Sequence, residues 1–130
     1  GPITYRRERS VVERLLSPSV AESILLAMEE ATPKGGTAIS VAVKGVRIGA
    51  KTGTSQIMNP ETNSYEDGTV LASTLAIVPL DKPKYIIYVA AGNPKGSTQW
   101  GSNIAAPAIG KIIESLVSQG KVVSDRSDKR

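Results

Sequence analysis

Two neighbouring runs of β-branched and other apolar residues constrain the fold of this chain more than any other feature. The first run covers residues 70–79 and the second covers residues 84–92. The residues between them, Leu80-Asp81-Lys82-Pro83, combine charge with proline and are typical of a turn. Two such runs so close together predict an antiparallel β-hairpin. Nearly every residue of the second run is apolar, so we expect cover on both of its faces.

A terminal helix is predicted over residues 104–119. Its apolar residues recur at i, i+3, i+4, i+7 and i+8, a stripe made by Ile109, Ile112, Ile113, Leu116 and Val117. Pro107 is compatible with the first turn, and Gly120 is placed to cap the end. This helix is expected to pack its stripe against the hairpin.

An earlier helix is predicted to begin at Ser17-Pro18, with Ser19 and Glu22 offering a competing capping box. Its apolar residues fall on one side, which we expect to be buried: Val20, Ala21, Ile24, Leu25 and Met28. Residues 32–36, with proline and two glycines, end it.

The stretch from Val46 to Gln56 ends an alternating strand, predicted over residues 47–54, with small polar side chains. Lys51 supplies one cation, and the hydroxyls of Thr52 and Thr54 supply hydrogen-bond donors. Gly53 has no side chain and would let another backbone approach closely. This pattern is typical of a site for an extended, anionic peptide.

The remaining segments predict connections. Residues 39–43 fit either a strand or a short helix, and residues 55–69 are rich in turn formers and predict a loop. Residues 93–103 predict a glycine-rich loop that carries Trp100, which either borders a cleft or packs on its own domain. The fold class expected is α+β, an antiparallel sheet of about three strands packed with two amphipathic helices. Residues 17–120 would form the folded part, with a lead-in over 1–16, including a Gly1-Pro2 tag remnant, and a polar tail over 121–130.

Composition excludes several kinds of site. The 130 residues contain no cysteine and no histidine, which rules out disulfides, thiol nucleophiles and histidine triads, and we expect neither a metal nor a cofactor. The net charge of +4 is spread along the chain without interleaved aromatics, so no nucleic-acid partner is indicated. No run reaches the length of about 18 apolar residues that a membrane span requires. The adjacent acidic pairs, Glu29-Glu30 and Glu66-Asp67, do not suit a two-carboxylate acid/base site.

The motif Lys51-Thr52-Gly53-Thr54 resembles the third motif of the penicillin-binding transpeptidases and their β-lactamase relatives. With Ser55-Gln56 behind it, the stretch is similar to the class B, cell-wall-synthesis branch. Two flanking stretches are also similar to this family: Gly36-Thr37-Ala38, before the strand, and residues 100–107, which lead into the last helix. The resemblance covers about residues 17–117, and it favours a short helix over residues 39–43.

The resemblance implies roles for the motif residues. Lys51 would donate to a serine of the family's middle motif and place positive charge over a substrate carboxylate. Thr52 and Thr54 would bind that carboxylate, with Thr54 the direct ligand, and Gly53 would permit β-strand pairing with the substrate. A backbone N–H near Ser55 would be one of two oxyanion-hole donors. Gln56 fits the family pattern without a defined role and equally suits a solvated position.

The nucleophile of that family is missing from this chain. The single Ser-x-x-Lys, Ser118-Gln119-Gly120-Lys121, follows the motif strand instead of preceding it and straddles a predicted helix end, and no Ser-x-Asn occurs. The resemblance is therefore to the C-terminal part of a transpeptidase domain. The strand after the motif also departs from the family pattern, with Thr74 and Ala76 where an aromatic residue and a glycine are expected.

Two functions are compatible with these observations. The first is part of a peptidoglycan D,D-transpeptidase, which would act on stem peptides, bind β-lactams and lie on the extracytoplasmic face of a bacterial membrane. The second is a non-catalytic α+β module that binds a peptide or a partner. In either case the chain alone is expected to be inactive. Residues 85–91 would present an unpaired apolar edge, normally covered by the missing N-terminal half, through which the chain could self-associate.

Overall fold

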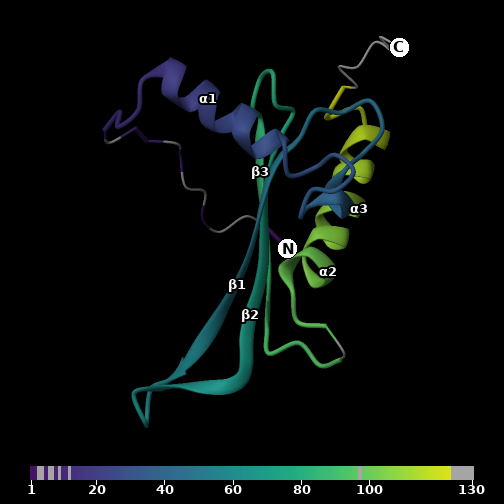
Figure 1. The fold of residues 1–130 in the computed structure, drawn as a ribbon. Helices are drawn as coiled ribbons and strands as arrows, with labels where there is room; N and C mark the ends of the chain where they lie inside the picture. Colours follow the sequence, from purple (N-terminus) through teal and green to yellow (C-terminus); the bar gives the residue numbers. More distant parts are fainter. Residues whose placement is uncertain (3–4, 6–7, 9, 12, 97, 124–130) are drawn as a thin grey trace.

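The computed structural model describes residues 1–2, 5, 8, 10–11, 13–96 and 98–123. A three-stranded antiparallel sheet lies between helix α1 (Pro18–Glu29) on one face and the helices α2 (Gly101–Ile104) and α3 (Ala106–Ser118) on the other (Figure 1). This arrangement confirms the predicted α+β fold class.

The sheet is built from β1 (Gly49–Asn59), β2 (Ser64–Val78) and β3 (Tyr85–Gly92), in the order β1-β2-β3. The predicted hairpin of residues 70–92 is confirmed as β2 and β3. The loop predicted over residues 55–69 is wrong, because most of it extends β1 and β2 and the turn occupies only residues 60–63. The Asp67-Gly68 pair lies inside β2, where the register with β1 shifts and Gly68 has a φ of 78°. Asp67 and Gly68 therefore mark an irregularity in the pairing of β2 with β1, and the chain does not reverse its direction there.

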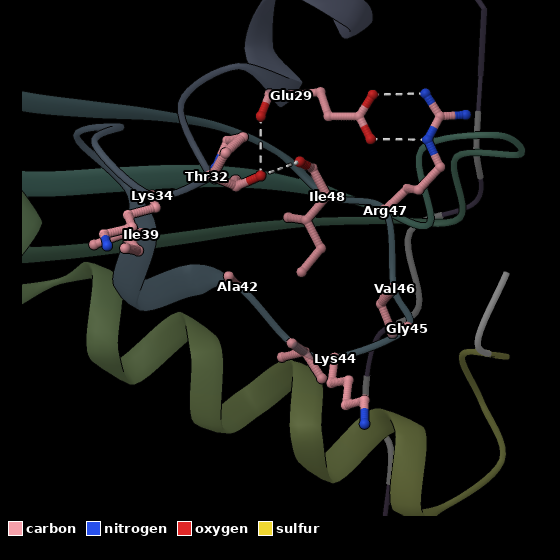
Figure 2. A pocket seen from close by; sticks show the side chains of 12 residues that line it. Glu29, Thr32, Lys34, Ile39, Ala42, Lys44, Gly45, Val46, Arg47 and Ile48 are labelled. Atoms are coloured by element: carbon pink, nitrogen blue, oxygen red, sulfur yellow. Dashed lines mark hydrogen bonds and ion pairs between the residues drawn. The ribbon is translucent and has the colours of Figure 1, made fainter. Parts of the chain in front are cut away.

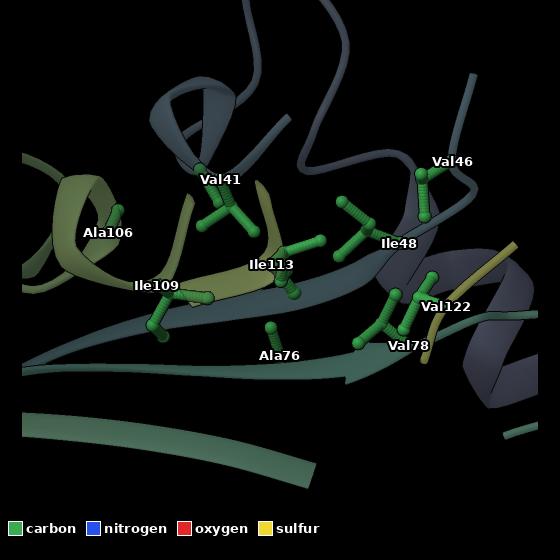
Figure 3. Close-up of a cluster of buried hydrophobic side chains, with 11 residues drawn as sticks. Val41, Val46, Ile48, Ala76, Val78, Ala106, Ile109, Ile113 and Val122 are labelled. Carbon is green, nitrogen blue, oxygen red and sulfur yellow. The ribbon is translucent and has the colours of Figure 1, made fainter. Parts of the chain in front are cut away.

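The core lies between the sheet and α3, as Figure 3 shows. Ala50, Ala76 and Val78 line the inner face of the sheet, and Ile109 and Ile113 of α3 pack against it. The 3-10 helix η1 (Ile39–Val41) adds Val41 from above, which confirms the short helix predicted there. Helix α3 approaches η1 closely through Gly110, since an added Cβ would lie 2.5 Å from the carbonyl oxygen of Ser40.

Helix α1 begins as predicted, because the Ser17 hydroxyl accepts a hydrogen bond of 3.3 Å from the backbone N–H of Val20. Its apolar side, however, is not buried as expected. Val20 and Ile24 are exposed, and α1 lies against the sheet only at the start of β1, near Gly49. Helical spacing therefore identified the apolar side of α1 correctly but did not show whether that side is buried.

The predicted C-terminal helix is α3, with Pro107 in its first turn. The loop predicted over residues 93–103 is wrong at its end, because residues 101–103 belong to the short helix α2. Ordered packing continues past Gly120, because Val122 is buried in the core. The rest of the predicted tail, residues 124–130, and part of the predicted lead-in lie outside the described residues. Among the helices of the described ranges, none combines the length and apolar character needed to cross a bilayer.

The outer strand β3 has one covered and one open face. Tyr85, Ile87 and Val89 turn toward the core, whereas Ile86 is 72% exposed and Tyr88 is 58% exposed. The expectation that both faces of this strand would be covered is therefore not met by the described residues.

Candidate functional site

The motif residues lie on β1, which forms one edge of the sheet (Figure 1). Strand alternation sends Lys51, Gly53 and Ser55 to the face on which α1 lies, and the residues between them to the face of α2 and α3. The side chains of Lys51, Thr54, Ser55 and Gln56 are exposed, and Thr52 and Gly53 are half-buried. The structure thus keeps the predicted site residues together on an open strand edge.

Two motif residues have informative neighbours. The Lys51 side chain folds back along its own strand, and its Nζ donates to the carbonyl oxygen of Thr52 at 2.5 Å. Gly53 is in regular strand pairing with Ser73, and the register shift lies further along, between Gln56 and Met58. Gly53 is therefore part of a regular strand ladder and is neither a bulge nor a turn.

A contact across the sheet joins the motif to the C-terminal segment. The Gly101 backbone N–H donates to Oγ1 of Thr54 at 3.3 Å, and Oγ1 of Thr74 donates to the Gly101 carbonyl at 3.0 Å. Gly101 lies so close to the sheet that an added Cβ would be 2.1 Å from the Ser73 carbonyl oxygen. Sequence reasoning missed Thr74 as a site residue. The only sequence signal was the unexpected small polar residue at position 74.

A small cavity of about 250 Å³ opens beside Thr54, with walls formed by Thr54, Val70, Gly96, Thr98, Gln99 and Trp100. The Gln99 side-chain amide donates to the Gly68 carbonyl at 3.0 Å and ties this loop to the irregular part of β2. Trp100 remains 65% exposed at the edge of the cavity. Of the two readings of Trp100, bordering a cleft fits this position better than packing on its own domain.

A larger cavity, about 590 Å³, is lined by residues between Glu29 and Ile48 and contains none of the motif residues (Figure 2). Beside it, Arg47 donates to both carboxylate oxygens of Glu29, at 2.8 and 2.6 Å, and also to Asp81. These hydrogen bonds raise the pKa of the Arg47 guanidinium above its usual range, and those with Glu29 contribute most. The three side chains join the end of α1 to the start of β1 and to the β2–β3 connection.

No described group of acidic side chains is placed to hold a metal ion. The chemistry available at β1 is therefore that of one ammonium, several hydroxyls and the backbone groups of an edge that no other described strand pairs with. Such a set can bind an extended chain that carries a carboxylate.

Comparison with known proteins identifies the family. The family model described as "Penicillin binding protein transpeptidase domain" matches residues 4–114. The chain belongs to the penicillin-binding protein transpeptidase family. Its relatives place it in the class B branch, as the sequence resemblance predicted.

One relative, the peptidoglycan D,D-transpeptidase FtsI homolog of Mesostigma viride, is 38% identical over 84% of this chain and 18% of its own length. The stage V sporulation protein D of Bacillus subtilis is 32% identical over 85% of this chain and 17% of its own length. Among solved structures, apo penicillin-binding protein 3 of Mycobacterium tuberculosis superimposes with a TM-score of 0.73 at 27% identity, covering 93% of this chain and 29% of that one. The chain thus spans less than a fifth of the length of either of these two relatives.

Proposed function

We propose that this chain is the substrate-strand portion of a serine-type D,D-transpeptidase that crosslinks peptidoglycan stem peptides through an acyl-serine intermediate. The observation that carries the proposal is the edge position of β1, which leaves the outer side of Lys51-Thr52-Gly53-Thr54 without a partner strand among the described residues. An extended peptide could add to this edge in the manner of a further strand. A β-lactam, whose carboxylate and acyl group resemble those of the peptide terminus, would compete for the same place.

Each motif residue has a role in this proposal that suits its placement. Lys51 supplies the positive charge near the nucleophile, and Thr52 and Thr54 supply hydroxyls for the substrate carboxylate. Gly53 leaves room for the substrate backbone, and a backbone N–H near Ser55 supplies one oxyanion donor. Gln56, exposed at the end of this run, would border the same edge.

The rest of the reaction would depend on a second part of the same domain. That part would carry the serine nucleophile with its lysine, the middle motif and the second oxyanion donor. The parent protein would be anchored in the bacterial cytoplasmic membrane with this domain on the extracytoplasmic side. The domain division into residues 17–120 with flanking segments is part of the same proposal.

The test joins this chain to the nucleophile-bearing part of its parent and exposes the product to a fluorescent penicillin. We expect no label on the chain alone, covalent label on the joined protein, and a loss of labelling rate of at least about tenfold for Lys51→Ala, because a charge close to the reacting centre is removed. Lys34→Ala, at the larger cavity of about 590 Å³ that contains no motif residue, is the matched control and should label normally.

The second candidate, a peptide-binding module without catalysis, is favoured by the same free strand edge and by the absence of a nucleophile motif from this chain. A joined protein that is folded by circular dichroism but never acquires label would support this module. The same result would overturn the transpeptidase proposal.

A further inference from the structure

Gly101 is held from both sides by two threonines that belong to different strands. Its N–H donates to Thr54 on β1, and its carbonyl accepts from Thr74 on β2. Its Cα lies over the β1–β2 backbone, with an added Cβ only 2.7 Å from the Gly53 carbonyl oxygen as well as 2.1 Å from that of Ser73. Gly101 therefore bridges the two strands at the level of the motif.

Thr74 is the buried support of this bridge. It is the one polar residue in the core of the described structure, and its single hydroxyl proton is shared between two acceptors, the carbonyls of Ser73 at 2.9 Å and Gly101 at 3.0 Å. A buried hydroxyl or carbonyl that loses a hydrogen-bond partner costs free energy. Without Thr74, the Gly101 carbonyl would keep only the 3.0 Å bond from the Ala105 N–H.

The bridge fixes how Thr54 can interact with a ligand. A hydroxyl has one proton to donate and two lone pairs that accept. The Gly101 N–H occupies one acceptor position on Oγ1 of Thr54 and leaves the hydroxyl proton free to donate to another group. Thr54 is exposed, beside the small cavity.

We propose that Thr74 is a positioning residue that holds Gly101 over the strands and thereby keeps the Thr54 hydroxyl as a hydrogen-bond donor toward a ligand carboxylate. The identity of the ligand as a carboxylate rests on the proposed function. The placement of Gly101 by Thr74 does not depend on it.

The first experiment needs no ligand and uses the chain itself. Thr74→Val keeps the shape of the side chain and removes the hydroxyl, and Thr74→Ser restores the hydroxyl. We expect Thr74→Val to speed hydrogen exchange of the Gly101 amide, followed by NMR, by about three- to tenfold beyond any change in global unfolding. Thr74→Ser should return the exchange rate toward that of the unchanged chain.

The matched control is Thr32→Val, which removes a hydroxyl that donates to the Glu29 carbonyl at 2.9 Å and lies 3.4 Å from the Ile48 carbonyl, before the start of β1 and outside the contacts of Gly101. It should alter stability without a local effect at Gly101. If Thr74→Val changes Gly101 exchange no more than Thr32→Val does, once both are corrected for unfolding, the role of Thr74 is overturned.

The second experiment measures penicillin acylation in the joined protein described above. Thr74→Val should lower the acylation rate by about the same three- to tenfold factor, Thr74→Ser should recover it, and Thr32→Val should leave it unchanged. Faster Gly101 exchange with an unchanged acylation rate would overturn the link from Gly101 to Thr54. If the unchanged joined protein takes no label, the proposed function fails, and the exchange result alone decides the role of Thr74.

Discussion

At the scale of single residues, Gly101 has the least tolerance for change among the residues of the site. The carbonyl oxygens that surround its Cα belong to the backbone of two strands and cannot rotate away as a side chain could. The small size of residue 101 is therefore a condition for bringing the loop of Trp100 against the motif strand. This explains in packing terms why a glycine stands between Trp100 and the helix that follows.

Gly101→Ala is expected to lower the free energy of unfolding by about 1–3 kcal/mol, because the methyl group has no space and the segment must move away from the sheet. Urea denaturation measures this change. Gly92→Ala is the matched control, since an added Cβ there meets nothing within 4 Å. Equal stabilities for the two variants would contradict the close packing at Gly101.

Arg47 offers a second prediction for a single residue. Arg47→Lys keeps the charge but loses the paired hydrogen bonds to Glu29, so we expect a loss of about 0.5–1 kcal/mol, limited by the partial exposure of the side chain. Arg14→Lys, an exposed position, should have no effect. Both effects are read from urea denaturation.

The pH dependence of the stability difference between Arg47→Lys and the unchanged chain follows from the raised pKa of Arg47. A raised folded-state pKa gives stability that is complete below the unfolded-state pKa and is lost only as the pH rises through the folded-state pKa, which for Arg47 lies far above neutral pH. The titration of Arg47 should therefore add no pH dependence between about pH 6 and pH 10. A difference between Arg47→Lys and the unchanged chain that fades steadily across that range would show that Arg47 is not the group responsible.

At the scale of elements, α3 provides the main cover for the inner face of the sheet, and its two neighbouring isoleucines test this. Ile113→Ala removes a fully buried side chain and should cost about 2–5 kcal/mol, whereas Ile112, which is 42% exposed, should cost much less when changed to alanine. Thermal unfolding followed by circular dichroism compares the two. Similar losses would mean that the stripe facing the sheet has been misassigned.

The elements also show what a sequence of this kind can predict. The hairpin and α3 were predicted from periodicity, because each is specified by residues close together in the chain. The long arms of β1 and β2 were missed, since Asp67-Gly68 favours a turn locally and only pairing with β1 keeps it in a strand. The contact between Thr74 and Gly101 joins residues far apart in sequence and leaves no repeating pattern. The roles of Lys51 and Thr54 came from the family resemblance, not from periodicity.

At the scale of the whole molecule, one face of the sheet carries several exposed apolar side chains. Ile86 and Tyr88 are exposed on it, and the exposed side chains Val20 and Ile24 of α1 add further apolar surface. In a larger transpeptidase domain this surface would be covered by other parts of the domain. In the isolated chain it adjoins β3, a strand edge that is unpaired among the described residues.

We therefore expect the isolated chain to self-associate through β3. Tyr88→Lys places a charge on the open face of that strand and should shift the chain toward monomer in light scattering at high concentration. Tyr65→Lys, an exposed tyrosine on the distant arm of β2, is the control and should not. A chain that is already monomeric and melts cooperatively at high concentration would contradict self-association.

The placement of Trp100 has a practical consequence. It is the only tryptophan in the chain, and it stands at the mouth of the hollow next to Thr54. Its fluorescence is therefore an intrinsic optical signal from this one location. Ligands that settle against the motif could be detected by titrating unlabelled protein, with no dye and no turnover required.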